Sequence, residues 1–292
     1  IIEEHKNKNT KLQQARESRD LNYKKVEFAS RWGFILAAMG SAVGLGNIWR
    51  FTFMAGENGG GAFIFFYFLF IVFFGMPCVM AMIVIGRRGG RSPAGSTQAL
   101  AVAEGKSPNW KYLGWVAILV AFLALTFFSV VAGWVLAYIP MSLSGAFEGI
   151  TGEQSNQLFA DVQSNVFGMM FWHGVFMALT MFVVSRGIQG GVEKTVKVMM
   201  PALFISLLIL VIYAALTGNF SEAFTFMFRP DFSKVDSNVI LLALGQAFFS
   251  LSVGGGGIIA YGAYLDREAS IPKAALSIAG ANVSVDMLAG MA

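Results

Sequence analysis

The chain is poor in charge. Only 13% of its 292 residues are Asp, Glu, Lys or Arg, whereas 56% are hydrophobic. A soluble domain carries about 25% charged residues, so this composition excludes an ordinary soluble globular protein. The chain also has a single cysteine, Cys78, which excludes a disulfide framework. Lipid is therefore the solvent that the composition indicates.

Motifs of several function classes are missing as well. The two histidines, His5 and His173, have no Cys or His partner at ligand spacing, so a metal-binding motif of that kind is not expected. No phosphate-binding loop of the Walker type is present, which argues against ATP-driven transport. No nucleophile with its base is recognisable, so we do not expect an enzyme. The basic residues at the start alternate with acidic ones, which does not support nucleic-acid binding.

Long apolar runs dominate what remains. They lie near residues 32–56, 62–86, 112–146, 166–186, 196–217, 238–265 and 274–292. Each is about long enough to cross the roughly 30 Å hydrocarbon core as a helix. The third run is overlong and is expected to tilt or to protrude into water. Because the runs are continuous rather than alternating, they predict an all-α multi-pass membrane protein and not a barrel.

The loops between the runs differ in charge. If residues 1–29 form a cytosolic amino-terminal tail, most Lys and Arg residues of the loops lie inside, and only Arg229 and Lys234 lie outside. This asymmetry predicts a cytoplasmic amino terminus. We expect residues 30–292 to form a transmembrane domain in the plasma (cell) membrane. The chain starts at Ile1 and its last apolar run stops at Ala292, so we expect a fragment of a longer protein.

The first and sixth runs contain helix breakers. Residues 40–47 read GSAVGLGN and residues 250–257 read SLSVGGGG. Glycine in a helix interior costs about 1 kcal/mol relative to alanine. Close helix packing through small residues is the alternative explanation, but packing alone does not call for Asn47 and Arg50 near mid-membrane. Interrupted helices at matching positions of two halves point to a transporter binding site, where freed N–H groups suit a carboxylate and freed carbonyls suit sodium.

Four segments carry a resemblance to a known family. Residues 40–51 and 57–63 resemble the first-helix signature of the neurotransmitter:sodium symporter family, 245–252 its sixth-helix motif, and 129–134 its third helix. The similarity runs from about residue 24 to 292 and is to bacterial leucine-transporter-like members. It implies an inverted five-helix-repeat fold with broken helices 1 and 6, truncated within helix 7. It also implies sodium-coupled symport of amino acids by alternating access.

The resemblance implies two sodium sites. Their ligands in this sequence would be Gly40, Ala42, Val43, Asn47, Ser250 and Asn282. The first site would use the Ala42 carbonyl and the three polar side chains. The second would use the Gly40 and Val43 carbonyls, and its other ligands belong to a helix that follows this sequence. Taken singly, each polar side chain could instead bond a neighbouring helix.

Substrate contacts follow from the same resemblance. They would be Ser41, Ala42, Gly44, Gly46, Ala124, Phe128, Phe249, Ser250, Ser252 and Gly255. Monoamine transporters of the family carry Asp at the position of Gly44, so glycine there favours an amino acid that brings its own carboxylate. Phe128 replaces a tyrosine whose hydroxyl touches that carboxylate. Gly255 replaces a bulky residue, which predicts a wider pocket for a larger side chain.

An acidic residue in the last run bears on chloride. Asp286 lies one turn after Asn282 on the same helix face, where animal members have serine and bind chloride nearby. A carboxylate there would supply the negative charge, with Tyr67 and Gln246 at matching positions, so we expect no chloride requirement. The alternative to a functional carboxylate is that Asp286 simply lies near the outer water layer.

The resemblance also implies gate roles for four residues, which are Arg50, Phe249, Lys25 and Tyr264.

The expected partners are a small amino acid and the bilayer, with Na⁺ as the coupled ion. The sequence allows a homodimer but does not fix the oligomeric state. A non-transporting membrane sensor or scaffold on the same fold, or an inactive fragment, is the alternative function. A channel is disfavoured because no repeated rings of carbonyls or charges are recognisable.

Overall fold

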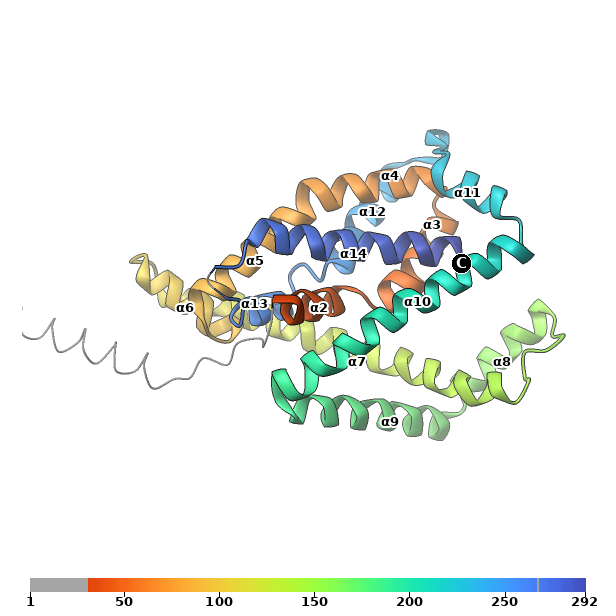
Figure 1. Cartoon of the computed structure of the whole chain (residues 1–292), viewed down its shortest axis with the longest axis horizontal. Helices are drawn as coiled ribbons and strands as arrows, with labels where there is room; N and C mark the ends of the chain where they lie inside the picture. The colour runs from red at the N-terminus through yellow and green to blue at the C-terminus, as the bar shows by residue number, and fades with distance from the viewer. Residues whose placement is uncertain (1–30, 267) are drawn as a thin grey trace, which may run out of the picture.

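The computed structural model describes residues 31–266 and 268–292, which fold entirely into helices and connecting loops (Figure 1). The helices are α2 (Arg31–Ala42), η1 (Gly46–Phe51), α3 (Thr52–Glu57), α4 (Gly61–Phe70), η2 (Ile71–Gly75), α5 (Met76–Gly89), α6 (Pro93–Ala103), η3 (Pro108–Trp110), α7 (Lys111–Leu143), α8 (Gly152–Ser164), α9 (Val166–Ser185), η4 (Ile188–Glu193), α10 (Lys194–Thr217), α11 (Phe220–Phe228), η5 (Phe232–Lys234), α12 (Ser237–Ser250), α13 (Gly256–Gly262) and α14 (Ile271–Met291). The predicted tail 1–29, with Lys25, lies outside the described residues.

Five helical segments of this part of the chain are long and apolar enough to cross a membrane. They are Gly61–Gly89, Pro108–Leu143, Val166–Ser185, Ile188–Thr217 and Ile271–Met291. The overlong third run becomes α7, whose 33 residues reach about 50 Å at 1.5 Å per residue. The first and sixth runs are each divided into shorter helices, as their glycines predict. α14 begins before the predicted residue 274, because Pro272 suits the first turn of a helix.

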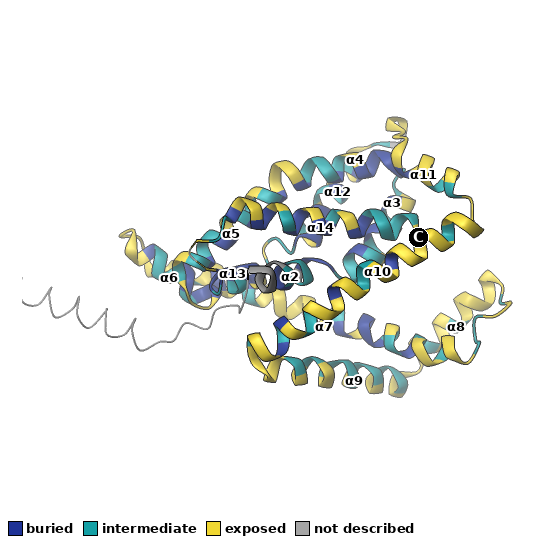
Figure 2. Cartoon of the chain, in the orientation of Figure 1, coloured by how far each residue is buried: buried dark blue, intermediate teal, exposed yellow. Residues whose placement is uncertain are grey.

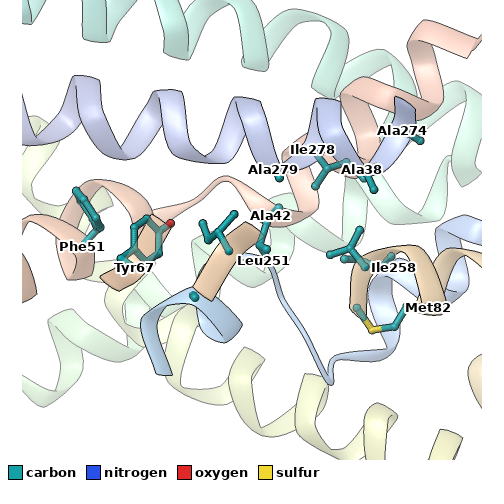
Figure 3. Packing of buried hydrophobic residues seen from close by; sticks show 14 of the residues in the cluster. Ala38, Ala42, Phe51, Tyr67, Met82, Leu251, Ile258, Ala274, Ile278 and Ala279 are labelled. Carbon is teal, nitrogen blue, oxygen red and sulfur yellow. The ribbon is translucent and has the colours of Figure 1, made fainter. Parts of the chain in front are cut away.

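The two interrupted spans pack in one bundle with their neighbours. α14 lies against α2, η1, α5 and α10, while α12 packs on α4 and α13 on α5. Figure 1 shows α14 running between α5 and α2, and α9 lying along α7 at one side of the molecule. The largest buried cluster joins these elements through Ala42, Phe51, Leu251 and Ile278 (Figure 3). The ends created by both breaks therefore meet inside the core.

Apolar side chains cover much of the outer surface of α7, α9 and α10. Phe122, Phe182 and Ile209 are each more than half exposed, and Figure 2 shows exposed residues all along these helices. A soluble monomer rarely exposes such a continuous apolar area. In a chain with several apolar spans, these faces are suited to lipid or to further helices.

Two glycines allow α5 and α13 to cross in direct backbone contact. A Cβ placed on Gly86 would lie 2.1 Å from the Ile259 carbonyl oxygen. A Cβ on Gly262 would lie 2.9 Å from the Ile83 carbonyl oxygen. Since backbone atoms cannot give way as a flexible side chain can, no side chain fits at either position.

Gly86→Ala is expected to lower stability by roughly 1–3 kcal/mol, because the added methyl group overpacks this crossing. The measurement is the apparent melting temperature in detergent, followed by size-exclusion chromatography. Gly174→Ala is the matched control, since a Cβ at Gly174 on α9 meets nothing within 4 Å. Equal melting temperatures for the two variants would contradict the proposed close crossing.

Candidate ion and substrate site

The break in the first span lies at Val43–Leu45, between α2 and η1. Asn47 stabilises it, since its side-chain Oδ1 accepts a hydrogen bond of 2.8 Å from the Gly44 backbone N–H. The backbone N–H of Asn47 in turn donates to the Gly44 carbonyl at 3.0 Å. An amide side chain thus satisfies a backbone group that the interruption frees from the helix.

The break in the sixth span lies at residues 251–255, between α12 and α13. Ser252 has a φ of 52° and is the one non-glycine residue with positive φ in the described ranges. Gly254 follows with a φ of 87°. A non-glycine residue in this region stores strain of about 1–3 kcal/mol, and such strain concentrates at functional sites.

Five buried polar residues meet where the two breaks face each other. This polar cluster consists of Asn47, Tyr67, Ser250, Asn282 and Asp286, none more than 2% exposed. Asn47 Nδ2 lies 3.1 Å from Ser250 Oγ, 2.8 Å from Asn282 Oδ1 and 2.9 Å from Asp286 Oδ1. The Tyr67 hydroxyl donates to the second Asp286 oxygen and lies 3.0 Å from Ser250 Oγ. The cluster connects η1, α4, α12 and α14.

Several oxygens converge around Asn282. Its Oδ1 lies 3.2 Å from the Ala42 carbonyl oxygen and 3.1 Å from both the carbonyl and the hydroxyl oxygen of Ser250. Acceptors so close together need either a donor or a cation between them. Rotating the amide would supply its nitrogen as the donor, whereas a bound cation would be held by the oxygens. Carbonyl, amide and hydroxyl oxygens are ligands that hard cations prefer, so the residues present fit sodium.

Asp286 is fully buried, and its carboxylate is the cluster's one acidic group. It accepts hydrogen bonds from Tyr67 and Asn47, and Asn282 Nδ2 lies 3.3 Å away. Within residues 31–266 and 268–292, no Lys or Arg forms an ion pair with it. A carboxylate inside a membrane span is costly and marks a functional site. A cation beside the cluster would offset that cost.

A cavity of about 260 Å³ lies beside η1 and α12. Its walls are Leu45, Gly46, Trp49, Arg50, Phe53, Met54, Phe127, Phe128, Val131 and Phe249. Gly46 faces Phe249 so closely that a Cβ would lie 2.6 Å from the ring, and a Cβ on Gly44 would lie 3.8 Å from Phe128. The Arg50 guanidinium lies 4.8 Å from the centre of the Phe249 ring and donates to Gln246 Oε1. The cavity is therefore mostly apolar, with five aromatic side chains and one cationic group.

The structure brings together only some of the predicted site residues. Gly46, Phe128 and Phe249 line the cavity with Arg50, whereas Ala124 is exposed on α7. Ser252 and Gly255 lie in the second break and not in the cavity wall.

Other predicted residues lie elsewhere or cannot be placed. Gln246 Nε2 donates to the Gly46 carbonyl at 3.1 Å, and its Oε1 accepts from Arg50, so Gln246 bonds to η1 and not to Asp286. Gly40 packs on Val196 and Met200 of α10. Tyr264 is half-buried just after α13. The Ser41 side chain and Lys25 lie outside what the structure describes, and the second sodium site stays a prediction.

Six wall residues were not predicted: Leu45, Trp49, Phe53, Met54, Phe127 and Val131. A helical spacing was available as a signal, since Trp49, Arg50 and Phe53 follow Gly46 at three, four and seven positions, on one helix face. On α7, Val131 follows Phe128 and Phe127 at three and four positions.

Comparison with known proteins identifies the family to which the chain belongs. The family model of the sodium:neurotransmitter symporter family matches residues 25–157 and 156–292. The chain belongs to this family. Its members are transporters, in agreement with the prediction that the chain is not an enzyme. Family membership also confirms a multi-pass membrane protein.

Relatives of this symporter family extend beyond the chain. It is 40% identical over 271 residues to the uncharacterized sodium-dependent transporter YhdH of Bacillus subtilis (strain 168), covering 92% of the chain and 59% of that protein. It is 32% identical to an uncharacterized sodium-dependent transporter of Haemophilus influenzae, covering 92% and 60%. The crystal structure of MhsT in complex with L-phenylalanine superposes with a TM-score of 0.83 and 42% identity, over 91% of this chain and 59% of that one. The fold prediction is confirmed.

The convergence of oxygens predicts that sodium stabilises the protein. Replacing potassium chloride by sodium chloride at constant ionic strength should raise the apparent melting temperature, because a ligand that binds only the folded state stabilises it. Asn282→Ala should abolish the shift.

Ser284→Ala is the control, since Ser284 is exposed on α14 and donates to the Gly280 carbonyl of its own helix. It should keep the full sodium-dependent shift. A shift of the same size in Asn282→Ala would rule out the polar cluster as the sodium site.

Proposed function

We propose that the protein is a sodium-coupled symporter of amino acids that works by alternating access. The observation that carries the proposal is the polar cluster, which lies where both interrupted helices meet and gathers oxygens around Asn282, one turn from the buried Asp286 carboxylate. The chain spans 59% of the length of YhdH and of MhsT. Its transport activity is therefore inferred from the site and from the family, whose relatives in bacteria are named sodium-dependent transporters.

Sodium is the transported ion in this proposal. Asn47, Ser250, Asn282 and the Ala42 carbonyl would hold it, and the Asp286 carboxylate supplies a negative charge within one hydrogen bond of Asn47. The ion offsets the cost of that buried charge. Binding would also join η1 to α12 and α14, so occupancy of the site is coupled to how the broken helices pack.

The cavity supports an amino acid with a large apolar side chain. Phe53, Phe127, Phe128 and Phe249 offer apolar walls, and Phe128 has no hydroxyl with which to bind a carboxylate. MhsT, a relative of similar fold, was crystallised with L-phenylalanine. Arg50 lies over Phe249 at one side of the cavity, where the pair would close it to water.

The charge of the loops supports a cytoplasmic amino terminus for this symporter.

Sodium-dependent binding of labelled amino acids by the protein extended to the length of its relatives tests this proposal. L-phenylalanine and L-leucine should bind in sodium and not in potassium, and glycine should compete weakly. Gly46→Ala should weaken binding by about tenfold or more, because the methyl group displaces the Phe249 ring.

Gly245→Ala is the matched control on α12, since a Cβ at this position meets nothing within 4 Å. Its binding should equal that of the wild type. If none of the amino acids binds in sodium, the proposal fails and a sensor or scaffold becomes the better explanation. Preference for glycine over phenylalanine would contradict the substrate class.

A second test concerns chloride. Replacing chloride by gluconate should leave uptake unchanged, because Asp286 already supplies the negative charge beside the site. Asp286→Ser should make uptake depend on chloride, since the serine leaves the charge to be supplied by an anion. Loss of wild-type uptake on chloride removal would contradict this role of Asp286.

A further inference from the structure

A second cavity, of about 330 Å³, lies between α7, α8 and α9. All of its walls come from residues 133–172, so it is complete within one contiguous stretch of the chain. It shares no lining residue with the cavity beside η1. Figure 1 shows α8 crossing the end of the α7–α9 pair, away from α14 and from the helix breaks.

The two cavities contact α7 at different levels along the helix. Phe127, Phe128 and Val131 line the cavity beside η1, whereas the second cavity is lined further along α7 by Gly133, Trp134, Ala137, Pro140 and Met141. A ligand between α7 and α9 would therefore not occupy the proposed substrate site.

Aromatic and thioether side chains form the walls of the second cavity. Trp134 and Trp172 line it together with Met141 and Met169. The indole N–H of Trp134 donates to Met169 Sδ at 3.4 Å, and its ring meets Phe159 of α8 edge to face, at 5.4 Å and 88°. Trp134 is thus fixed by both α8 and α9, and the wall is formed in advance of any ligand.

One acidic group lines the same cavity. Asp161 of α8 is exposed, and its carboxylate accepts a hydrogen bond of 3.0 Å from Gln157. It forms no ion pair within the described ranges. The segment 147–165 holds two further acids, Glu148 and Glu153, and no Lys or Arg. The mouth of the cavity therefore carries a negative potential that is not locally neutralised.

We propose that the cavity between α7, α8 and α9 binds a small organic cation that carries an ammonium group. The faces of tryptophan rings attract such cations, most strongly where water is excluded. Asp161 supplies the opposite charge at the mouth, and Met141 and Met169 accommodate the alkyl groups of the ligand. The cation can come from a free amine in solution or from the headgroup of a lipid. The site does not depend on the proposed transport function, since none of its residues belongs to the polar cluster.

Equilibrium binding of radiolabelled choline to the protein in phosphatidylglycerol nanodiscs tests the site. Saturable binding is expected, and Asp161→Asn should weaken it by about tenfold. Glu153→Gln is the matched control, since Glu153 also lies on α8 but does not line the cavity. Its affinity should equal that of the wild type.

A second pair of variants tests the role of the ring. Trp172→Phe should retain binding in part, whereas Trp172→Leu should abolish it, because leucine fills space without an aromatic face. Choline binding should be equal in sodium chloride and in potassium chloride, which separates this site from the proposed sodium site. A requirement of choline binding for sodium would overturn the assignment to α7–α9.

Nanodiscs of phosphatidylcholine identify the source of the cation. If lipid headgroups occupy the site, free choline should no longer bind in these discs. If the site opens to water, choline should bind equally in both lipids. Either result supports the ammonium site.

Three further results would overturn the proposal. They are the absence of saturable choline binding in phosphatidylglycerol, equal affinity in Asp161→Asn, and competition by the neutral isostere 3,3-dimethyl-1-butanol as strong as that by choline itself. The last result would show that the cavity selects for shape and not for charge.

Discussion

The burial of Asp286 is the constraint on which the rest of the site depends. A carboxylate with no exposed surface inside an apolar bundle must be compensated, and the compensation comes from two other helices and from its own. Tyr67 reaches it from α4, Asn47 from η1, and Asn282 from its own helix α14. Each donor is itself buried, so none can be replaced by water. The positions of η1, α4 and α14 are in this sense fixed by one negative charge.

The two helix breaks place the backbone so that polar groups can reach the buried Asp286 carboxylate. Asn47 can reach Asp286 and Ser250 while its own oxygen caps the Gly44 N–H. Ser250 sits at the last position of α12, and the positive φ of Ser252 turns the chain immediately after it. A continuous helix would keep both the Ala42 and the Ser250 carbonyl inside its own hydrogen-bond ladder. Interrupting both helices brings these two oxygens to within 3.2 Å of Asn282.

The spans and the breaks could be predicted from the sequence because local amino-acid composition marks both. Apolar runs differ in composition from the polar loops around them, and clustered glycines differ from the rest of an apolar run. The residues of the polar cluster were then predicted from the family resemblance. Some cavity residues were not predicted, because an aromatic residue does not stand out in composition within an apolar span. They include Trp49, Phe53 and Phe127. The partner of Gln246 escaped too, since it depends on how α12 and η1 pack. α8 lay outside the predicted spans. The start of this helix could have been predicted from its capping box, which Thr151 forms with Gln154.

The π-helical geometry of η1 has a mechanical consequence. A π-helix places more residues in each turn than an α-helix does, and such segments are frequent at functional sites. Relaxing one π turn to α geometry shifts the register by one residue, which rotates the side chains beyond it by about 100°. In η1 that rotation would carry Arg50 off the Phe249 ring and turn Met54 of α3 away from the cavity. A local change of helix pitch next to Asn47 would thus become a change in access to the cavity.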